Sequence, residues 1–212
     1  MSFTRDVIRG LKNALTKKQT IEWKHELSKK SELIWRLPNE KYKNIKDIDI
    51  LIVKEYERAA LIQSGFLKNV LTQGSHTLPI NTDEIIYIDI SPQTRPFGVP
   101  KSSGLLTKDQ SRIGFSGNIS FKIKEDNVDI GNFITKIVSH ANSLPCNQLI
   151  KWLREGPIYI ALRDVIKDRT FDQFLKIGSE ELQLELESKI GFNLTSYGIE
   201  LLSINITNFT IH

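Results

Sequence analysis

The chain of 212 residues lacks any long apolar run. Its longest stretches without an acidic or basic side chain, residues 69–82 and 137–150, contain many polar residues. They fall short of the roughly 18 apolar residues that a transmembrane helix needs, so the sequence predicts no membrane span. Cysteine is equally scarce, because Cys146 is the only one. A single cysteine excludes an intramolecular disulfide framework and a cysteine-based zinc site, and it predicts a reducing, intracellular setting.

Catalytic motifs are also lacking. Residues 114–118, Gly-Phe-Ser-Gly-Asn, approach the nucleophile elbow of hydrolases, but Asn118 stands where that motif requires glycine. Because strand-like sequence flanks the segment on both sides, we interpret it as a β-bulge or twist point. Cys146 and His140 are separated by Pro145 and have no reason to face each other. We expect a buried or loop cysteine there and no thiol–imidazole pair.

Metal and cofactor sites are not indicated either. Asp164, Asp168 and Asp172 recur every four residues, but basic residues alternate with them, which is typical of a solvated helix face. His25 and His76 are isolated, and the sequence contains no phosphate loop or dinucleotide fingerprint. We therefore expect a protein that is not an enzyme and that binds no cofactor or metal.

Positive charge is concentrated at one end of the chain. The formal net charge is +4, from 29 basic and 25 acidic residues. Five of the basic residues and one of the acidic residues lie in the first 20 positions, which leaves 24 of each kind in the remainder. A hydrophobic content of 40% is ordinary for a folded soluble protein. The sequence therefore predicts a neutral body with a basic N-terminal segment.

Residues 1–19 have the pattern of an amphipathic helix. At about 100° per residue, the apolar side chains share one arc and most basic side chains lie opposite them. This arrangement is typical of a helix that lies in a membrane interface with its cations near anionic headgroups. The predicted membrane-contact residues are Phe3, Arg5, Val7, Ile8, Arg9, Leu11, Lys12, Leu15, Lys17 and Lys18.

Other interpretations of this segment stay open. Its apolar face could pack onto the body or onto a neighbouring subunit, and a basic, amphipathic segment also fits an organellar transit peptide. A nucleic-acid-binding arm is disfavoured, because the body has no excess of basic residues to support one. The expected partner is thus an anionic membrane surface and not a nucleic acid.

The first part of the chain predicts strands. Residues 49–78 have the pattern of a β-meander, with turns at Ser64-Gly65 and Gln73-Gly74. Residues 105–124 predict a hairpin. The prolines in residues 91–104 predict a connecting loop, because proline has no N–H for a strand ladder. The expected strands are residues 50–53, 59–62, 66–71 and 84–91.

The second part predicts helices and a last strand. Apolar residues at helical spacing occur in residues 133–141 and 158–166. Thr170 and Gln173 form a capping box for a short helix that ends at Gly178. Ser179 is expected to cap the next helix, which should end at Gly191 and expose Glu185 and Lys189 as a charged pair; residues 199–211 then form a strand. The fold class is therefore α+β.

Four segments carry a family resemblance, and they occur along the chain as residues 21–39, 49–78, 105–133 and 198–211. In this order they resemble the SPFH (band 7) domain of stomatins, prohibitins and flotillins. Residues 21–39 are similar to the tryptophan-containing hairpin of a soluble prokaryotic branch, the virion-core-protein-like proteins. Residues 105–133 resemble a turn, long strand and helix start of the family, and residues 198–211 resemble its closing strand. The family's opening strands and G-x-H-x-L turn match Val53, Glu55, Ala59, Ala60, Gly65, Gly74, His76 and Leu78.

The resemblance implies an SPFH-type domain with a β-rich first lobe at residues 20–124 and an α/β second lobe at residues 125–212, preceded by the amphipathic helix at residues 1–19. It also implies a scaffold that forms rings or cages, gathers lipids and regulates membrane proteins.

We accordingly expect a homo-oligomer, peripheral at the cytoplasmic face of a membrane, with an unknown membrane-protein client. The rival interpretation is a soluble adaptor whose N-terminal helix docks on a protein partner. Family chains usually continue past the closing strand into a long helix, so we expect either a truncated chain or an oligomer that is built differently.

Overall fold

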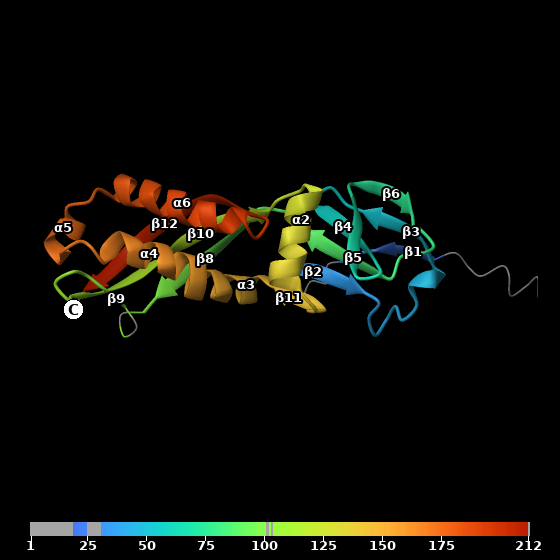
Figure 1. Ribbon diagram of the computed structural model, residues 1–212, viewed down its shortest axis with the longest axis horizontal. Coiled ribbons are helices and arrows are strands. Elements are labelled where there is room, and N and C mark those ends of the chain that lie inside the picture. Colours follow the sequence, from blue (N-terminus) through green and yellow to red (C-terminus); the bar gives the residue numbers. More distant parts are fainter. Residues whose placement is uncertain (1–18, 25–30, 101, 103, 212) are drawn as a thin grey trace, which may run out of the picture. The chain divides into compact units, whose positions relative to one another are not determined.

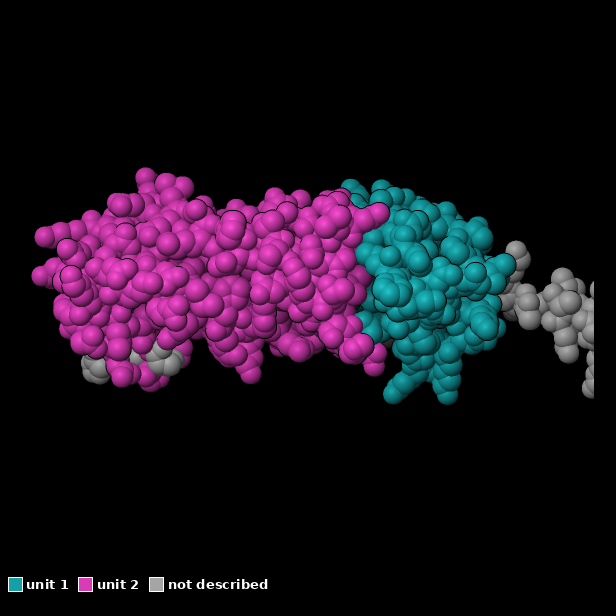
Figure 2. Space-filling view, in the orientation of Figure 1, with its two compact units in different colours: residues 1–30, 34–89 teal, residues 31–33, 90–212 magenta. Residues whose placement is uncertain are grey.

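A computed structural model describes residues 19–24, 31–100, 102 and 104–211. The chain divides into two compact units (Figure 2). Unit 1 comprises residues 1–30 and 34–89, and unit 2 comprises residues 31–33 and 90–212. Figure 1 labels the elements of both units.

Unit 1 consists of two small sheets. In the first sheet β3 lies between β1, which is parallel to it, and β6, which is antiparallel. The second sheet has the antiparallel order β2-β7-β4-β5. The elements are β1 (Gln19–Glu22), β2 (Glu32–Leu37), the short 3-10 helix η2 (Ile45–Asp47), β3 (Ile48–Val53), β4 (Glu57–Gln63), β5 (Phe66–Leu71), β6 (Gly74–Thr77) and β7 (Glu84–Asp89).

The core of unit 1 lies between these sheets. β7 carries the run Ile85 to Ile88, whose four side chains are all buried, as expected for a strand with neighbours on both edges. Tyr87 packs against Trp35, with ring centroids 5.5 Å apart, and against Trp23 at 6.4 Å. The aromatic cluster therefore joins β1, β2 and β7.

Unit 2 is an antiparallel sheet with helices on one face. The strand order is β12-β10-β8, and β9 pairs with the start of β10. The strands of this sheet are β8 (Gln93–Val99), β9 (Leu105–Leu106), β10 (Arg112–Ile123) and β12 (Ile199–Ile211). The short strand β11 (Ser143–Pro145) is not part of it. The helical elements are α2 (Asn127–Phe133), η4 (Ile134–Val138), α3 (Cys146–Leu153), η5 (Arg154–Ile158), α4 (Tyr159–Ile166), α5 (Phe171–Leu175) and α6 (Ser179–Thr195).

Strand β10 shows why one face of this sheet is covered. Ile113, Phe115, Ile119 and Phe121 are buried, and the alternating side chains, such as Asn118, are polar and more exposed. This two-residue period places the apolar face against the helices and the polar face in solvent. Figure 1 shows α4 and α6 side by side against the strands.

The positions of most predicted strands are confirmed, but two predicted pairings are wrong. The predicted meander does not form, because β3 pairs with β1 and β6 while β4 pairs with β5 and β7. The predicted hairpin of residues 21–39 is also wrong, because β1 pairs with β3 and β2 pairs with β7. Local patterns locate strands, whereas pairing partners depend on contacts far apart in the chain.

The prediction of a loop at residues 91–104 is also wrong in part. Residues Gln93–Val99 form β8, in which Pro96 lies opposite Asn118 of β10. β8 is at the edge of its sheet, where a residue without an N–H can have its nitrogen on the unpaired side. The predicted hairpin of residues 105–124 is confirmed by the pairing of β9 with β10.

The helical predictions are confirmed in part. The capping box of Thr170 and Gln173 is present, with both hydrogen bonds formed. The predicted N-cap and C-cap of the following helix are wrong, because the N-cap is Gly178 and α6 continues through Gly191 to Thr195. Glu185 pairs with Arg169 at 3.1 Å, so the predicted charged pair with Lys189 is replaced by a tertiary contact.

The α+β class is thus confirmed for the described residues. The predicted N-terminal helix at residues 1–19 lies almost wholly outside them, and the lobe boundary after residue 124 stays a prediction. Within the described ranges, no helix has the length and apolar character to cross a membrane.

Candidate membrane-contact surface

The predicted membrane-contact residues Phe3, Arg5, Val7, Ile8, Arg9, Leu11, Lys12, Leu15, Lys17 and Lys18 all lie outside the described residues. What the structure does describe is the strand that follows them. β1 begins at Gln19, which pairs with Ile48 at the start of β3. The end of unit 1 at which β3 starts is therefore the place where this N-terminal segment joins the fold.

Strand β1 is held by a partly buried polar cluster. The Lys54 ammonium lies 3.2 Å from the Glu22 carboxylate and 3.7 Å from that of Glu57, and it donates to the Trp23 carbonyl oxygen. The Tyr87 hydroxyl lies 3.4 Å from the Ile21 carbonyl oxygen, to which it donates. These contacts attach β1 to the core.

The environment of Tyr87 keeps its hydroxyl neutral. Burial raises the pKa of Tyr87 above its ordinary value of 10.0, and the carboxylates of Glu57 and Glu22 raise it further. A neutral phenol is a hydrogen-bond donor, which the carbonyl oxygens of Ile21 and Ile52 require.

Three loops meet at the same end of unit 1 as the start of β1. The Leu78 N–H donates to the Asp49 carbonyl oxygen at 2.8 Å, which places the turn after β6 beside the start of β3. The Asp83 N–H donates to the Ile62 carbonyl oxygen at 2.9 Å, and its carboxylate accepts from the Ser64 N–H at 2.5 Å. The loop after β2 also starts at this end, because Leu37 pairs with Ile85 near the start of β7.

Two large apolar side chains project from these loops. Ile80 is 92% exposed in the turn between β6 and β7, and Phe66 is 69% exposed directly after the turn between β4 and β5. We call these two residues the apolar tip. Burying each of them would release roughly 1.5–3 kcal/mol, so exposure in water has a cost that an apolar phase would remove.

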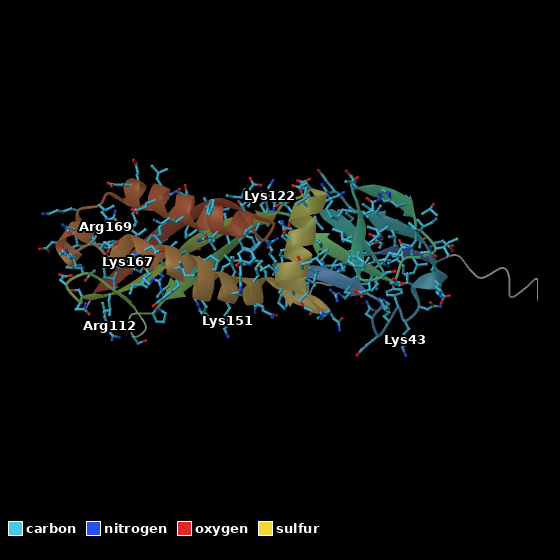
Figure 3. The ribbon with its side chains drawn as sticks, viewed as in Figure 1. Lys43, Arg112, Lys122, Lys151, Lys167 and Arg169 are labelled. Carbon is cyan, nitrogen blue, oxygen red and sulfur yellow. The ribbon has the colours of Figure 1, made fainter. Side chains whose placement is uncertain are left out.

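Basic side chains lie on the loop after β2, at the same end of unit 1 as the apolar tip. The loop after β2 exposes Lys41, Lys43 and Lys46, with Glu40 and Asp47 among them. Figure 3 labels Lys43 on this loop. Apolar side chains next to ammonium groups are suited to an interface in which hydrocarbon lies beneath a layer of anionic headgroups.

Other residues singled out in the sequence have structural roles. The β10–β12 pairing shifts register between Ser116 and Gly117, which confirms the predicted β-bulge. A Cβ on Gly117 would stand 2.1 Å from the Asn205 carbonyl oxygen, so this position requires glycine. Cys146 is buried and His140 is exposed.

Asp164, one of the three regularly spaced aspartates, pairs with nearby cations. Lys167 lies 3.0 Å and Arg163 lies 3.6 Å from the Asp164 carboxylate. Hydrogen bonding from Lys167 lowers the pKa of Asp164, as expected for a solvated helix face. Among the described residues, no group of three or more His, Cys, Asp or Glu is placed to hold a metal ion.

The sequence patterns do not predict the exposure of Phe66 and Ile80. Phe66 was assigned to a strand, where an apolar residue is expected to be buried, and Ile80 follows Pro79 in a segment without a clear pattern. Their exposure is indicated by the neighbouring turn residues. Gly65-Phe66 and Pro79-Ile80 each place a large apolar residue in or beside a turn, where side chains are usually solvated.

Comparison with known protein families gives a match over most of the chain. The family model described as SPFH domain / Band 7 family matches residues 51–212, about three quarters of the chain. No curated protein matches the chain.

Proposed function

The chain belongs to the SPFH domain / Band 7 family, known for membrane scaffolding, and from this premise we propose that it is a peripheral membrane scaffold. In this proposal the apolar tip and the N-terminal segment contact an anionic membrane surface at its cytoplasmic face. Copies of the chain associate with one another and organise lipids or membrane-protein clients.

The observation that carries the proposal is the exposure of Ile80 and Phe66 at the end of unit 1 where β1 begins. The apolar stripe and cations predicted for residues 1–18 would then act beside the apolar tip and not at a separate site. The apolar tip and the N-terminal segment would contact the same membrane surface, so binding by either one raises the effective concentration of the other at that surface.

The magnitudes favour a reversible contact. Two partly inserted side chains at ~1.5–3 kcal/mol each, with about 1 kcal/mol for each nearby cation over an anionic leaflet, give a weak to moderate affinity. Several copies in one assembly would bind much more firmly, because each dissociating copy stays tethered by the others.

Vesicle flotation tests the proposal. The full chain is mixed with vesicles of phosphatidylcholine alone or with phosphatidylserine, and the double variant Phe66→Glu/Ile80→Glu is compared with Tyr56→Glu. Tyr56 is a matched control, because it is 56% exposed but lies in the turn between β3 and β4, at the opposite end of unit 1.

We expect wild type and the Tyr56 variant to float with the anionic vesicles and the double variant to remain unbound. Deletion of residues 1–18 should also weaken flotation, more strongly at low salt. If wild type fails to float at any salt concentration, the membrane role is wrong and the soluble adaptor becomes the better interpretation.

A further inference from the structure

Helix α6 has an outward ridge that lacks the charges usual on a solvated helix. Its inner side buries Leu182, Leu186, Ile190 and Leu194. On the outer side Phe192 is 84% exposed and Leu184 is 67% exposed. Only Ser188 lies between them on this ridge, so the two large apolar residues form an unpartnered stripe on unit 2.

Unit 2 also contains an apolar hollow beside the same helix. Residues from α5, the start of α6 and β12 enclose a volume of about 200 Å³. The apolar lining comes from Phe174, Leu175, Leu182, Ile206 and Phe209, and polar side chains such as Asn205 and Gln183 lie among them. The floor is rigid, because Phe174 packs edge-on against Phe209 at 5.8 Å and against Phe115 at 5.8 Å.

The hollow and the Phe192 side chain match in size. An apolar cavity of about 150 Å³ is enough to hold a benzene molecule, so 200 Å³ accommodates a phenyl ring. The apolar side chains of the hollow can pack against a phenyl ring, which needs no hydrogen-bond partner, while Glu180, Asn205 and Asn208 are among the polar residues of its lining.

The side chain and the hollow face different neighbours of α6. At about 100° per residue, Phe192 lies close to the azimuth of Glu185, whose carboxylate is 3.1 Å from Arg169 at the end of α4. Figure 3 labels Arg169 in this region. The hollow lies on the flank of Glu187, whose carboxylate accepts from the Ile204 N–H of β12 at 3.3 Å. A molecule therefore presents the ring on its α4 side and the hollow on its β12 side.

The edges of the unit 2 sheet are poor alternatives for association. β8 contains Pro96 and is followed by Pro100, which removes backbone donors from that edge. β12 has two register shifts against β10, and Glu187 accepts from the N–H of Ile204 at its outer edge. Strand addition at either edge is disfavoured, which leaves the helical layer for association.

We propose that the Phe192 ring of one copy inserts into the hollow of a second copy, lined by α5, α6 and β12. This inference rests on the proposed function, because it names the self-association that a scaffold requires. Since the ring and the hollow are different surfaces, each copy can bind one neighbour on each side. Such a head-to-tail contact builds a ring when the rotation closes and a filament when it does not.

The first test is the concentration dependence of the full chain's mass, measured by sedimentation velocity for wild type and Phe192→Ser. The control is Val128→Ser, which removes another strongly exposed apolar side chain of unit 2, on α2. We expect wild type to associate, Phe192→Ser to weaken association about tenfold or more, and Val128→Ser to match wild type.

Disulfide trapping tests the pairing itself. Phe192→Cys and Leu175→Cys place thiols on the ring position and on the hollow, and the natural Cys146 is buried and does not compete. Mixing the two single variants should give a crosslinked dimer, and the double variant should give a ladder of higher multiples.

A monomeric wild type, an equal loss in Val128→Ser, or efficient crosslinking of Phe192→Cys with itself would overturn the inference. The last result would indicate a two-fold contact. Vesicle flotation separates these outcomes from the membrane role: a monomer that floats leaves the membrane contact standing without this interface. Association without flotation would leave this interface standing without the membrane contact.

Discussion

Gly198 lies against the backbone of Asp129, and a Cβ at position 198 would stand 2.0 Å from the Asp129 carbonyl oxygen. Gly198 also has φ of +72°, a conformation that side chains with a Cβ rarely adopt. It connects α6 to β12, and its carbonyl oxygen accepts from the Lys124 N–H at 2.9 Å. This glycine therefore determines how the closing strand returns to the sheet beside α2.

Gly198→Ala should destabilise the protein by about 1–3 kcal/mol or more, because both the backbone angle and the contact with Asp129 are unfavourable for alanine. Gly156→Ala is the matched control, since a Cβ there meets nothing within 4 Å. Urea denaturation followed by tryptophan fluorescence measures both variants. Equal urea midpoints for Gly198→Ala and Gly156→Ala would show that the close contact at Gly198 relaxes without a loss of stability.

Tyr87→Phe should reduce stability by about 1 kcal/mol, because the carbonyl oxygens of Ile21 and Ile52 lose their donor while the aromatic packing stays. Tyr56→Phe, at an exposed position, should have no measurable effect. Hydrogen exchange should show faster exchange in β1 of the Tyr87 variant only. Unchanged exchange in β1 would mean that this hydroxyl does not hold the strand.

The stability of wild type should fall as the pH rises above 10.0, the ordinary pKa of tyrosine. The folded state keeps the Tyr87 proton because burial raises its pKa, whereas the unfolded chain releases it. The stabilisation is therefore complete below pH 10.0 and declines above it. Tyr87→Phe should lack this part of the decline. The difference in free energy of unfolding between wild type and Tyr87→Phe should therefore become smaller in urea titrations at alkaline pH.

Asp109→Asn should weaken the attachment of α5 to the β9–β10 turn. The Asp109 carboxylate accepts from the Thr107 hydroxyl at 2.5 Å and from the Phe171 N–H at 3.0 Å. The Thr107 hydrogen bond, with that of Phe171, lowers the pKa of Asp109 below its ordinary value of 3.8.

The Asp109 carboxylate thus contributes stability above pH 3.8, and this contribution is lost as the pH falls through its lowered pKa. The melting temperature of Asp109→Asn should be lower than that of wild type at pH 7, and the gap should close in acid. Asp168→Asn, on an exposed carboxylate, serves as the control. A gap independent of pH would contradict the role assigned to the charge.

Replacing Lys41, Lys43 and Lys46 together by glutamine should weaken binding to anionic vesicles, by about 1 kcal/mol for each cation that contacts the surface. Binding to neutral vesicles should not change, and the loss should shrink as salt is added. Lys151→Gln, on α3 of unit 2, is the control. Equal losses on neutral and anionic vesicles would remove these lysines from the proposed contact.

Local features of this fold could be read from the sequence because short-range chemistry determines them. The Thr170–Gln173 capping box needs only residues three apart, and the strands β4 and β5 need only alternating or continuous apolar runs bounded by Ser64-Gly65. The bulge at Ser116-Gly117 was signalled by a glycine inside a strand pattern. The family followed from the order of such local patterns.

Only the tertiary structure decided which strands pair, which apolar residues stay in solvent and which charges meet. β8 is a strand despite Pro96 because it has a neighbour on one side only, and Glu185 meets Arg169 because α4 and α6 lie side by side. Phe66 and Ile80 resemble core residues in the sequence, and their exposure depends on where three separate loops converge. The physical reason is that burial and pairing are set by chain segments far apart in sequence, whereas periodicity and capping are set by neighbours.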